Sequence, residues 1–407
     1  MTRGSRTWMY FALALAWFFV LLWPLLDIYP DGTLGFAKTF GVWLRVSIAA
    51  VICFILYRLG KTGYLDFVLK PLGRLRDGVG GVYAKAPKWM FLVPLAAFAL
   101  CYPLFTERYA QDVAVNVLVY ICLGLGLNVV VGLCGLLDLG YIAFYGVGAY
   151  TYALLSVHYG VPFWVCLPIC AGLASIAGAL IGYPTLRMRG DYLAIVTLGF
   201  GEIVRIVLNN WMSLTNGPNG ILGIKAPGIY LPEFVDGAFT FEHIYMKKLD
   251  MLYYVILVLA VFTVIAVRRL NFSRVGRAWE AIREDETAAE LMGVNTFVYK
   301  LLAYAMGALF GGLAGAFFAA RMRFVSPESF TFLESAMVLA MVVLGGMGSI
   351  PGVILGALAL VALPEVFRDF ELYRMLAFGG VMAVMMIVRP AGLWPAARMG
   401  KRSEDEA

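Results

Sequence analysis

Long apolar runs follow one another along the sequence from residue 8 to residue 388, separated by short polar stretches. A run of about 20 apolar residues is long enough to cross the hydrocarbon core of a bilayer as an α-helix. The runs that reach or approach this length are 8–26, 40–57, 89–104, 113–133, 139–158, 163–183, 192–211, 251–267, 299–320 and 372–388. The pattern predicts an all-α polytopic membrane protein.

The apolar stretch 333–368 is too long for one span, and helix-weakening residues interrupt it. Glycine lowers the rigidity of a helix, and proline removes one backbone donor. The interrupting residues are Gly345, Gly346, Gly348, Pro351 and Gly352. We interpret the stretch as two segments, which gives about 11–12 transmembrane segments in all, some of them broken or short.

The composition excludes a water-soluble enzyme. Hydrophobic residues occupy 62% of the 407 positions and charged residues only 14%, whereas soluble domains have about 25% charged residues. The loops leave no room for a separate catalytic domain. We therefore expect a protein that is not an enzyme and has no catalytic residues.

Lys and Arg residues in the loops predict the orientation, because basic residues near span ends are retained on the cytoplasmic side. The N-terminus, the tail and the loops 58–88, 184–191 and 268–298 carry 20 such residues, and the opposite loops carry 9. Both termini are therefore predicted to be cytoplasmic. These basic loops explain the net charge of +6 without a nucleic-acid partner.

Neither a metal site nor a nucleotide site is expected in this chain. All six cysteines lie in or beside apolar segments, as small packing residues do. Cys166 and Cys170 share a helix face, but His158 and His243 are distant in sequence. The single Gly-Lys-Thr run, at Gly60, lacks the upstream glycine of a phosphate-binding loop. Any energy from ATP must then come through another protein.

The predicted inner loop 268–298 has a helical pattern without being apolar, and Gly276 and Gly293 bracket the expected helix. One face of this helix is expected to carry Ala278, Ile282, Ala289 and Met292. Small residues flanked by charges are typical of a helix that docks into a groove of another protein. A solvated connector helix is the alternative. The missing energy source favours the docking helix.

Several stretches, in family order, resemble the signatures of LivM-type permeases, which belong to ABC importers of branched-chain amino acids. The stretches are NVVVGLCGLLDLGYIAFYGVGAY at 128–150, LRMRGDYLAIVTLGFGEIVR at 186–205, NGPNGI at 216–221, SPESFTF at 326–332 and VLGGMGS at 343–349. Residues 276–293 resemble the coupling helix of the same family. The resemblance covers about 112–395 and implies a permease core at 111–395. It also implies an N-terminal membrane extension at 1–110, with about three spans, and a cytoplasmic tail at 396–407.

This resemblance implies an inner-membrane permease for branched-chain or related hydrophobic amino acids, surrounded by membrane lipid. The implied partners are a second, LivH-like permease, two cytoplasmic ABC ATPases that hydrolyse the ATP, and a periplasmic or extracellular substrate-binding protein. The chain itself would bind no cofactor. Closure of the ATPase pair would tilt the spans between inward-open and outward-open states. The residues implied to meet the ATPase are Gly276, Arg277, Ala278, Glu280, Ala281, Arg283, Glu284 and Asp285.

Charged residues within spans are functional candidates because hydrocarbon solvates them poorly. Glu202 and Arg205 are three residues apart on one predicted helix and can pair with each other, which we favour over a role in lining the pathway. Broken helix ends offer partial charges that suit a zwitterionic amino acid. The candidates for a pathway or helix-break role are Glu202, Gly345, Gly346 and Gly348.

Two other functions stay open at this point. The first is an ABC permease for urea or short amides, which belongs to the same superfamily. The second is an ion-coupled secondary transporter, which would show inverted repeats with matching helix breaks and an isolated carboxylate in mid-membrane. Only one strong break is visible, at 345–352, and this favours the ABC permease.

Overall fold

The structure, a computed structural model, describes residues 99–188, 190–235, 238–245, 249–366, 379 and 392–394. The chain divides into two compact units, Met1–Ala96 and Ala97–Ala407, and the described residues all belong to the second. The predicted domain boundaries stay predictions. The predicted segments that lie outside the described residues are 8–26, 40–57, 372–388 apart from residue 379, and most of 89–104.

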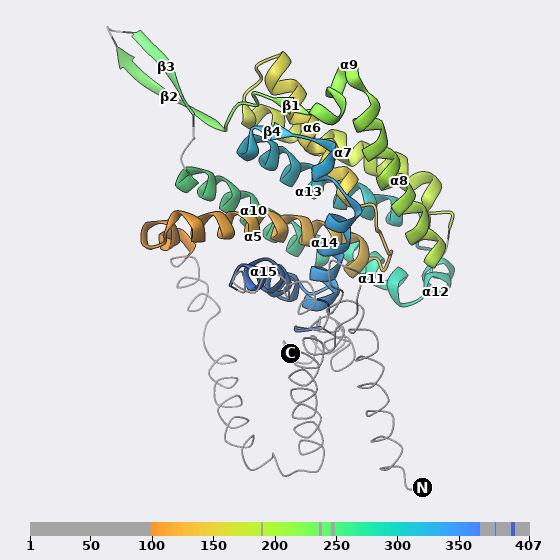
Figure 1. Ribbon diagram of the computed structural model, residues 1–407. Coiled ribbons are helices and arrows are strands. Elements are labelled where there is room, and N and C mark those ends of the chain that lie inside the picture. The colour runs from red at the N-terminus through yellow and green to blue at the C-terminus, as the bar shows by residue number, and fades with distance from the viewer. Residues whose placement is uncertain are drawn as a thin grey trace, which may run out of the picture. The chain divides into compact units, whose positions relative to one another are not determined.

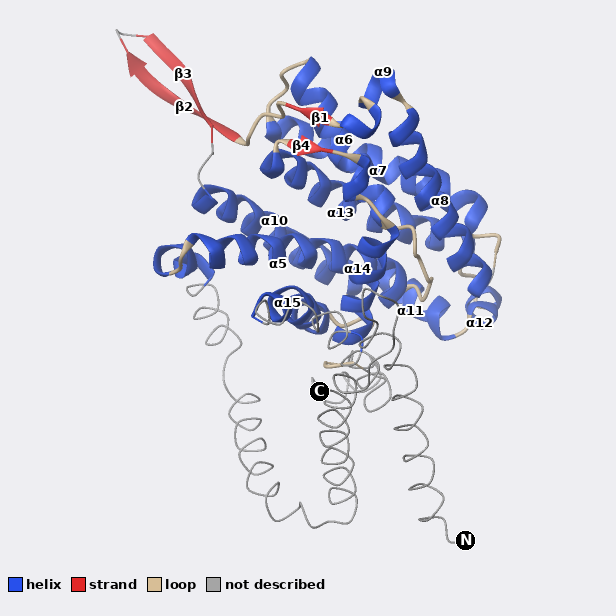
Figure 2. Ribbon diagram, in the orientation of Figure 1, coloured by secondary structure: helices blue, strands red, loops and turns tan. Residues whose placement is uncertain are grey.

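Helices dominate the described residues (Figures 1 and 2). The long ones are α5 (Arg108–Leu127), α6 (Ile142–His158), α7 (Phe163–Thr185), α8 (Asp191–Asn210), α10 (Leu249–Asn271), α13 (Thr296–Met322), α14 (Phe332–Gly345) and α15 (Ile350–Val366). The short ones are the π-helix η1 (Asn128–Leu133), α9 (Met212–Thr215), η2 (Gly217–Asn219), α11 (Arg274–Glu284), α12 (Glu286–Leu291) and η3 (Pro327–Ser329).

Among the described residues, six helical segments are long and apolar enough to cross a membrane. These segments are Arg108–Leu133, Phe163–Thr185, Tyr192–Asn210, Leu249–Asn271, Thr296–Met322 and Pro327–Gly345. The predicted all-α polytopic class is confirmed. α5, α10 and α13 extend a few residues beyond the predicted spans into their polar flanks, whereas α6 begins three residues later than predicted.

α13 lies at the centre of this unit and packs against α5, α6 and α7. Its glycines allow the close approach. A Cβ added at Gly315 would lie 2.1 Å from the carbonyl oxygen of Tyr145 in α6, and one at Gly312 would lie 2.4 Å from the Cβ of Ala174 in α7. These small-residue contacts between membrane helices set the distance between α13 and its neighbours.

α14 and α15 pack against each other on either side of a break at residues 346–349. Gly346 (φ 117°) and Gly348 (φ 84°) adopt backbone conformations that other residues rarely take. The predicted interruption is thus present, but it is shorter than expected. Pro351 and Gly352 lie in the first turn of α15, where a missing backbone donor costs little, since helix-starting N–H groups have no partner within the helix.

Strands occur only between helices in the described residues, and the sequence pattern did not reveal them. β2 (Gly228–Val235) and β3 (Ala238–Tyr245) form an antiparallel hairpin within the long loop 212–250. β1 (Ile221–Leu222) pairs with β4 (Phe324–Val325). This short ladder brings the NGPNGI and SPESFTF stretches together although about 100 residues separate them. We refer to this end of the unit as the hairpin end.

Candidate functional site

The loop helix predicted at 276–293 is two helices, α11 and α12, and we call the region that they occupy the α11 end. The Ser273 hydroxyl accepts the Gly276 N–H at 3.2 Å and caps α11. Asp285 interrupts the helix with extended backbone and caps α12 by accepting the Ala288 N–H at 3.0 Å. The prediction that Gly276 brackets the helix is wrong, because it lies inside α11. Gly293 does follow the end of α12, with φ 86°.

Trp279 attaches α11 to the spans. Its side chain is fully buried, and its indole Nε1 donates to the carbonyl oxygen of Tyr299 in α13 at 2.7 Å. Gly276, one turn earlier, is also buried, because a Cβ there would lie 2.3 Å from the carbonyl oxygen of Leu270. Ile282 completes the buried face. The predicted apolar face is therefore partly wrong: Ile282 and Ala289 are buried, but Met292 is 85% exposed.

α12 is joined to α13 by an ion pair. The Lys300 ammonium lies 2.6 Å from a carboxylate oxygen of Glu286, and Lys300 is buried. A charge at a buried position needs such a partner, because desolvation is otherwise expensive. The pair holds α12 beside the first turns of α13, so α11 and α12 form one attached unit.

The open side of this unit carries most of the residues that the family resemblance singled out. Ala278 and Glu280 are half-buried, and Gly276 is buried. The exposed members of the predicted set are Arg277, Ala281, Arg283, Glu284 and Asp285. Leu291 and Met292, at the end of α12, are exposed as well. The surface thus combines charges of both signs with two large apolar side chains, and we call it the α11 surface.

Arg283 is the exception within this set, because it also reaches inward. Its guanidinium donates to the carbonyl oxygen of Gly132 in η1. Its side chain also packs against Gly135, because a Cβ added at Gly135 would lie 3.0 Å from the Arg283 Cγ. α11 therefore touches the end of the span formed by α5 and η1. No pattern in the sequence indicated this contact.

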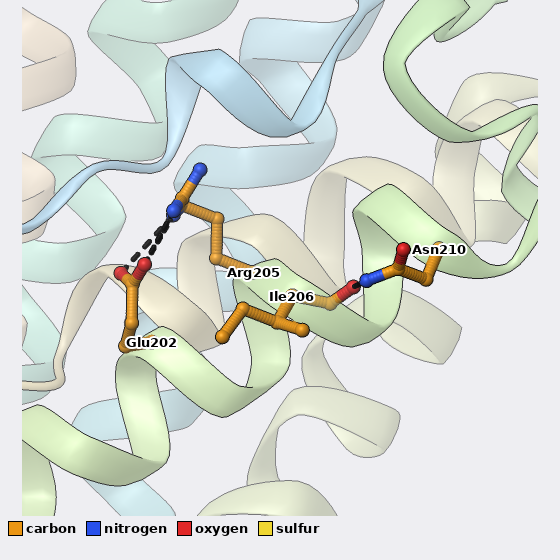
Figure 3. Close-up of polar contacts among 4 residues, drawn as sticks. All are labelled: Glu202, Arg205, Ile206 and Asn210. Carbon is orange, nitrogen blue, oxygen red and sulfur yellow. Dashed lines mark hydrogen bonds and ion pairs between the residues drawn. The ribbon is translucent and has the colours of Figure 1, made fainter.

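Glu202 and Arg205 form the predicted pair on α8 (Figure 3). The Arg205 Nε donates to both carboxylate oxygens of Glu202, at 2.9 and 3.0 Å. Both side chains leave α8 on the same side and meet at their tips. The Arg205 side chain is 31% exposed and the Glu202 side chain is 39% exposed. Only 11% of the apolar stretch of α8 is buried, so this face of the helix is open within the chain.

Gly345, Gly346 and Gly348 surround the break between α14 and α15. The Gly348 N–H donates to the Asn128 Oδ1 of η1 at 2.8 Å. A Cβ at Gly345 would lie 2.2 Å from the carbonyl oxygen of Gly352, which shows how closely α15 approaches. The structure therefore joins the break to η1 and, through Arg283, to α11, but it does not bring Glu202 into this group.

A buried carboxyl lies in the segment that links η1 to α6. Asp138 is 1% exposed, its Oδ1 accepts the Gly140 N–H at 2.9 Å, and its Oδ2 has no hydrogen-bond partner. Burial raises the pKa of this carboxyl to about 6, and the Gly140 N–H and the Thr197 side chain partly oppose that rise. Together with Asn128, Trp279 and Lys300, Asp138 belongs to a group of buried polar residues at the α11 end. Asp138 was a functional candidate from the sequence, as a charge near a predicted span. The sequence analysis had given Asn128, Trp279 and Lys300 no site role, and the isolated tryptophan in a polar helix was the best available signal for them.

No group of three or more His, Cys, Asp or Glu side chains in the described residues is arranged to hold a metal ion. The described parts of the candidate site are the exposed α11 surface and the junctions of α11 and α12 with α13 and η1.

Comparisons with known proteins find relatives of this chain. Residues 109–389 match the family model for the permease component of branched-chain amino acid transport systems. The high-affinity branched-chain amino acid transport system permease protein LivM of Escherichia coli K12 is 49% identical over 88% of this chain and 86% of its own length. A probable LivM of Methanocaldococcus jannaschii is 25% identical over 67% of this chain and 84% of its own length.

The permease protein LivH of the E. coli K12 high-affinity system is 24% identical over 67% of this chain and 90% of its own length. LivM and LivH carry the name of the same transport system, and both resemble this chain. They indicate that permeases of this kind occur as a homologous pair. No solved structure matches the chain.

Proposed function

This chain belongs to the family of permease components of branched-chain amino acid transport systems, as the family match and the 49% identity show. From this premise we propose how it works. It is a multi-pass membrane protein and the permease subunit of a branched-chain amino acid ABC transporter. The names of its relatives favour these amino acids over urea or short amides as the solute, and the ABC family argues against an ion-coupled transporter.

The α11 surface is the proposed contact with a cytoplasmic ATPase. One observation carries the proposal: outside the spans, α11 and α12 are fastened on one side by Trp279 and Lys300 and leave charges and the exposed Leu291 and Met292 on the other. Adjacent exposed apolar side chains mark sites of protein contact. Because the unit is fastened to α13, a force on its open side would reach a span.

The proposed partners divide the work of transport. Two ATPases hydrolyse ATP on the cytoplasmic side, so this chain needs no cofactor and performs no catalysis. A periplasmic or extracellular binding protein delivers the amino acid at the hairpin end, where β2 and β3 extend the loop between α8 and α10. Both termini then lie in the cytoplasm, in agreement with the distribution of Lys and Arg residues.

The open face of α8 is the proposed contact with the second permease and the wall of the pathway. Lipid solvates an ion pair poorly, yet Glu202 and Arg205 stay partly exposed within this chain. Pairing with another permease would cover them or place them beside water. η3 packs near the same helix and brings Glu328 toward Arg205, which adds a further polar group for a zwitterionic solute.

The experiment that tests the ATPase contact reverses two exposed charges on α11, Arg277→Glu with Glu284→Lys, in the complete transporter. We expect about tenfold less ATPase to co-purify with the permease, since a central charged contact is worth that much or more. Uptake of leucine into proteoliposomes should fall in parallel. Glu107→Lys, an exposed reversal before α5 at the hairpin end, is the control and should retain the ATPase. Normal ATPase retention by the α11 variant would contradict the proposal.

A further inference from the structure

A continuous series of contacts runs from α11 to the break between α14 and α15. The Arg283 guanidinium donates to the Gly132 carbonyl oxygen in η1. Gly132 in turn lies against Asn128, and the Asn128 Oδ1 accepts the Gly348 N–H at 2.8 Å. Three segments that are far apart in sequence thus meet at η1.

η1 differs from the helix that it continues. α5 ends as an ordinary α-helix at Leu127, and the next six residues form a π-helix, all of them buried. Short π-helical turns are rare and occur frequently at functional sites. The wider turn places Asn128 and Gly132 on the side of the span that faces the break, so the unusual backbone and the series of contacts coincide.

Gly132 leaves no free space between its neighbours. A Cβ at this position would lie 1.9 Å from the Asn128 Oδ1 and 2.5 Å from the Gly348 nitrogen. A displacement of Gly132 toward the break would therefore push against both atoms. Closely packed interiors respond in this way because they deform little before they rearrange.

Asn128 is the member of the series that is incompletely bonded. It is fully buried, and while its Oδ1 has a partner, its amide Nδ2 has none. A buried donor without an acceptor is unfavourable, so a small movement that gives this amide a partner would be stabilising. An unpaired amide of this kind is therefore expected at a helix junction that can adopt two alternative arrangements.

We propose that Asn128 is a positioning residue that passes displacements of α11 to the helix break at 346–349 and thereby couples the ATPase cycle to movement of α14 and α15. The inference rests on the proposed function, because an ATPase must move α11. It goes further by assigning the route: α11 acts through Arg283 on Gly132, and Gly132 acts through Asn128 on Gly348.

The test measures leucine taken up per ATP hydrolysed by the complete transporter in proteoliposomes. Asn128→Leu removes both polar atoms at nearly constant volume, and we expect the ratio to fall about tenfold while the ATPase stays bound, as the loss of one buried hydrogen bond allows. Asn128→Asp keeps an acceptor for the Gly348 N–H and should retain most of the ratio. If Asn128→Leu does not assemble, Asn128→Ser, too short to reach Gly348, replaces it.

Gln111→Leu is the matched control. Gln111 lies in the first turn of α5, the helix that η1 continues. It is also buried, and it donates to the carbonyl oxygens of Pro103 and Thr106. Gln111→Leu should lower the stability of the protein without changing the amount of leucine taken up per ATP hydrolysed. An unchanged ratio in Asn128→Leu, or an equal loss in Gln111→Leu, would overturn the inference. ATPase retention by the α11 charge-reversal variant reports separately on the proposed function, so the two failures can be told apart.

Discussion

α13 and α8 are both apolar enough to span a membrane, yet their surroundings are opposite. Their apolar stretches have mean hydropathies of 1.8 and 1.5. In α13, 67% of the stretch is buried within the chain, and in α8 only 11% is. α13 packs against three helices through its glycines, whereas α8 presents an ion pair and a row of exposed aliphatic side chains.

The difference shows that hydropathy identifies a span without identifying what covers it. Both helices can leave water at a similar gain in free energy, and that gain is the same whether lipid, this chain or a second permease provides the cover. Close backbone contact at small residues distinguishes α13, the helix that is covered by other helices of the same chain. The helix without such contacts is the one available to a partner.

The largest expected effect compares one glycine from each helix. Gly315→Ala places a Cβ 2.1 Å from a backbone oxygen of α6, which cannot move without displacing the helix, so we expect a destabilisation of at least about 3 kcal/mol. Gly199→Ala on α8 meets nothing within 4 Å and should stabilise the chain by up to about 1 kcal/mol through helix propensity. Thermal unfolding of the purified chain in detergent measures both.

Equal destabilisation by the two glycine variants would show that α8 is packed as closely as α13, which contradicts the difference between the two helices. A loss of stability confined to Gly315→Ala would support that difference. Because both substitutions are the same, helix propensity cancels between them and only the surroundings differ.

A smaller effect is expected from the ion pair on α8. Glu202→Gln leaves the Arg205 guanidinium without its partner, which should cost about 1–3 kcal/mol where water is scarce, and less of the second permease should co-purify. The double variant Glu202→Gln with Arg205→Gln removes both charges and should recover most of the assembly. If the double variant assembles no better than the single one, neutralisation is not the role of the pair.

Asn210→Ala is the control for the ion pair, since Asn210 is exposed on the same helix and its amide only donates to the Ile206 carbonyl oxygen at 2.8 Å (Figure 3). It should leave assembly unchanged, because that amide can bond with water or with its own helix instead.

The smallest expected effect is a pH dependence that arises at Asp138. Its folded-state pKa, about 6, is above the ordinary value of 3.8, so the folded chain binds the proton more tightly than the unfolded chain does. Lowering the pH from 7.5 to 5 should therefore stabilise the folded chain by about 1 kcal/mol. Asp138→Asn should lack this gain. Parallel shifts of the melting temperature in both proteins would contradict the assignment.

Some parts of the site followed from the sequence. The interruption at Gly345, Gly346 and Gly348 was predicted because those residues weaken helices locally, and the Glu202–Arg205 pair because three-residue spacing brings side chains together on one helix. The face of α11 was only partly predicted. Periodicity favoured Met292 as a contact, but the kink at Asp285 rotates α12 relative to α11 and exposes that side chain.

The sequence alone determined the membrane class, the position of the spans, the helix break and the family, because hydropathy, glycine content and motif order are properties of neighbouring residues. Only the tertiary structure decided that Trp279 fastens α11 to α13, that β1 meets β4, that α8 is left open, and that Asn128 joins η1 to Gly348. These contacts depend on distances between segments up to about 220 residues apart, and no local pattern records such distances.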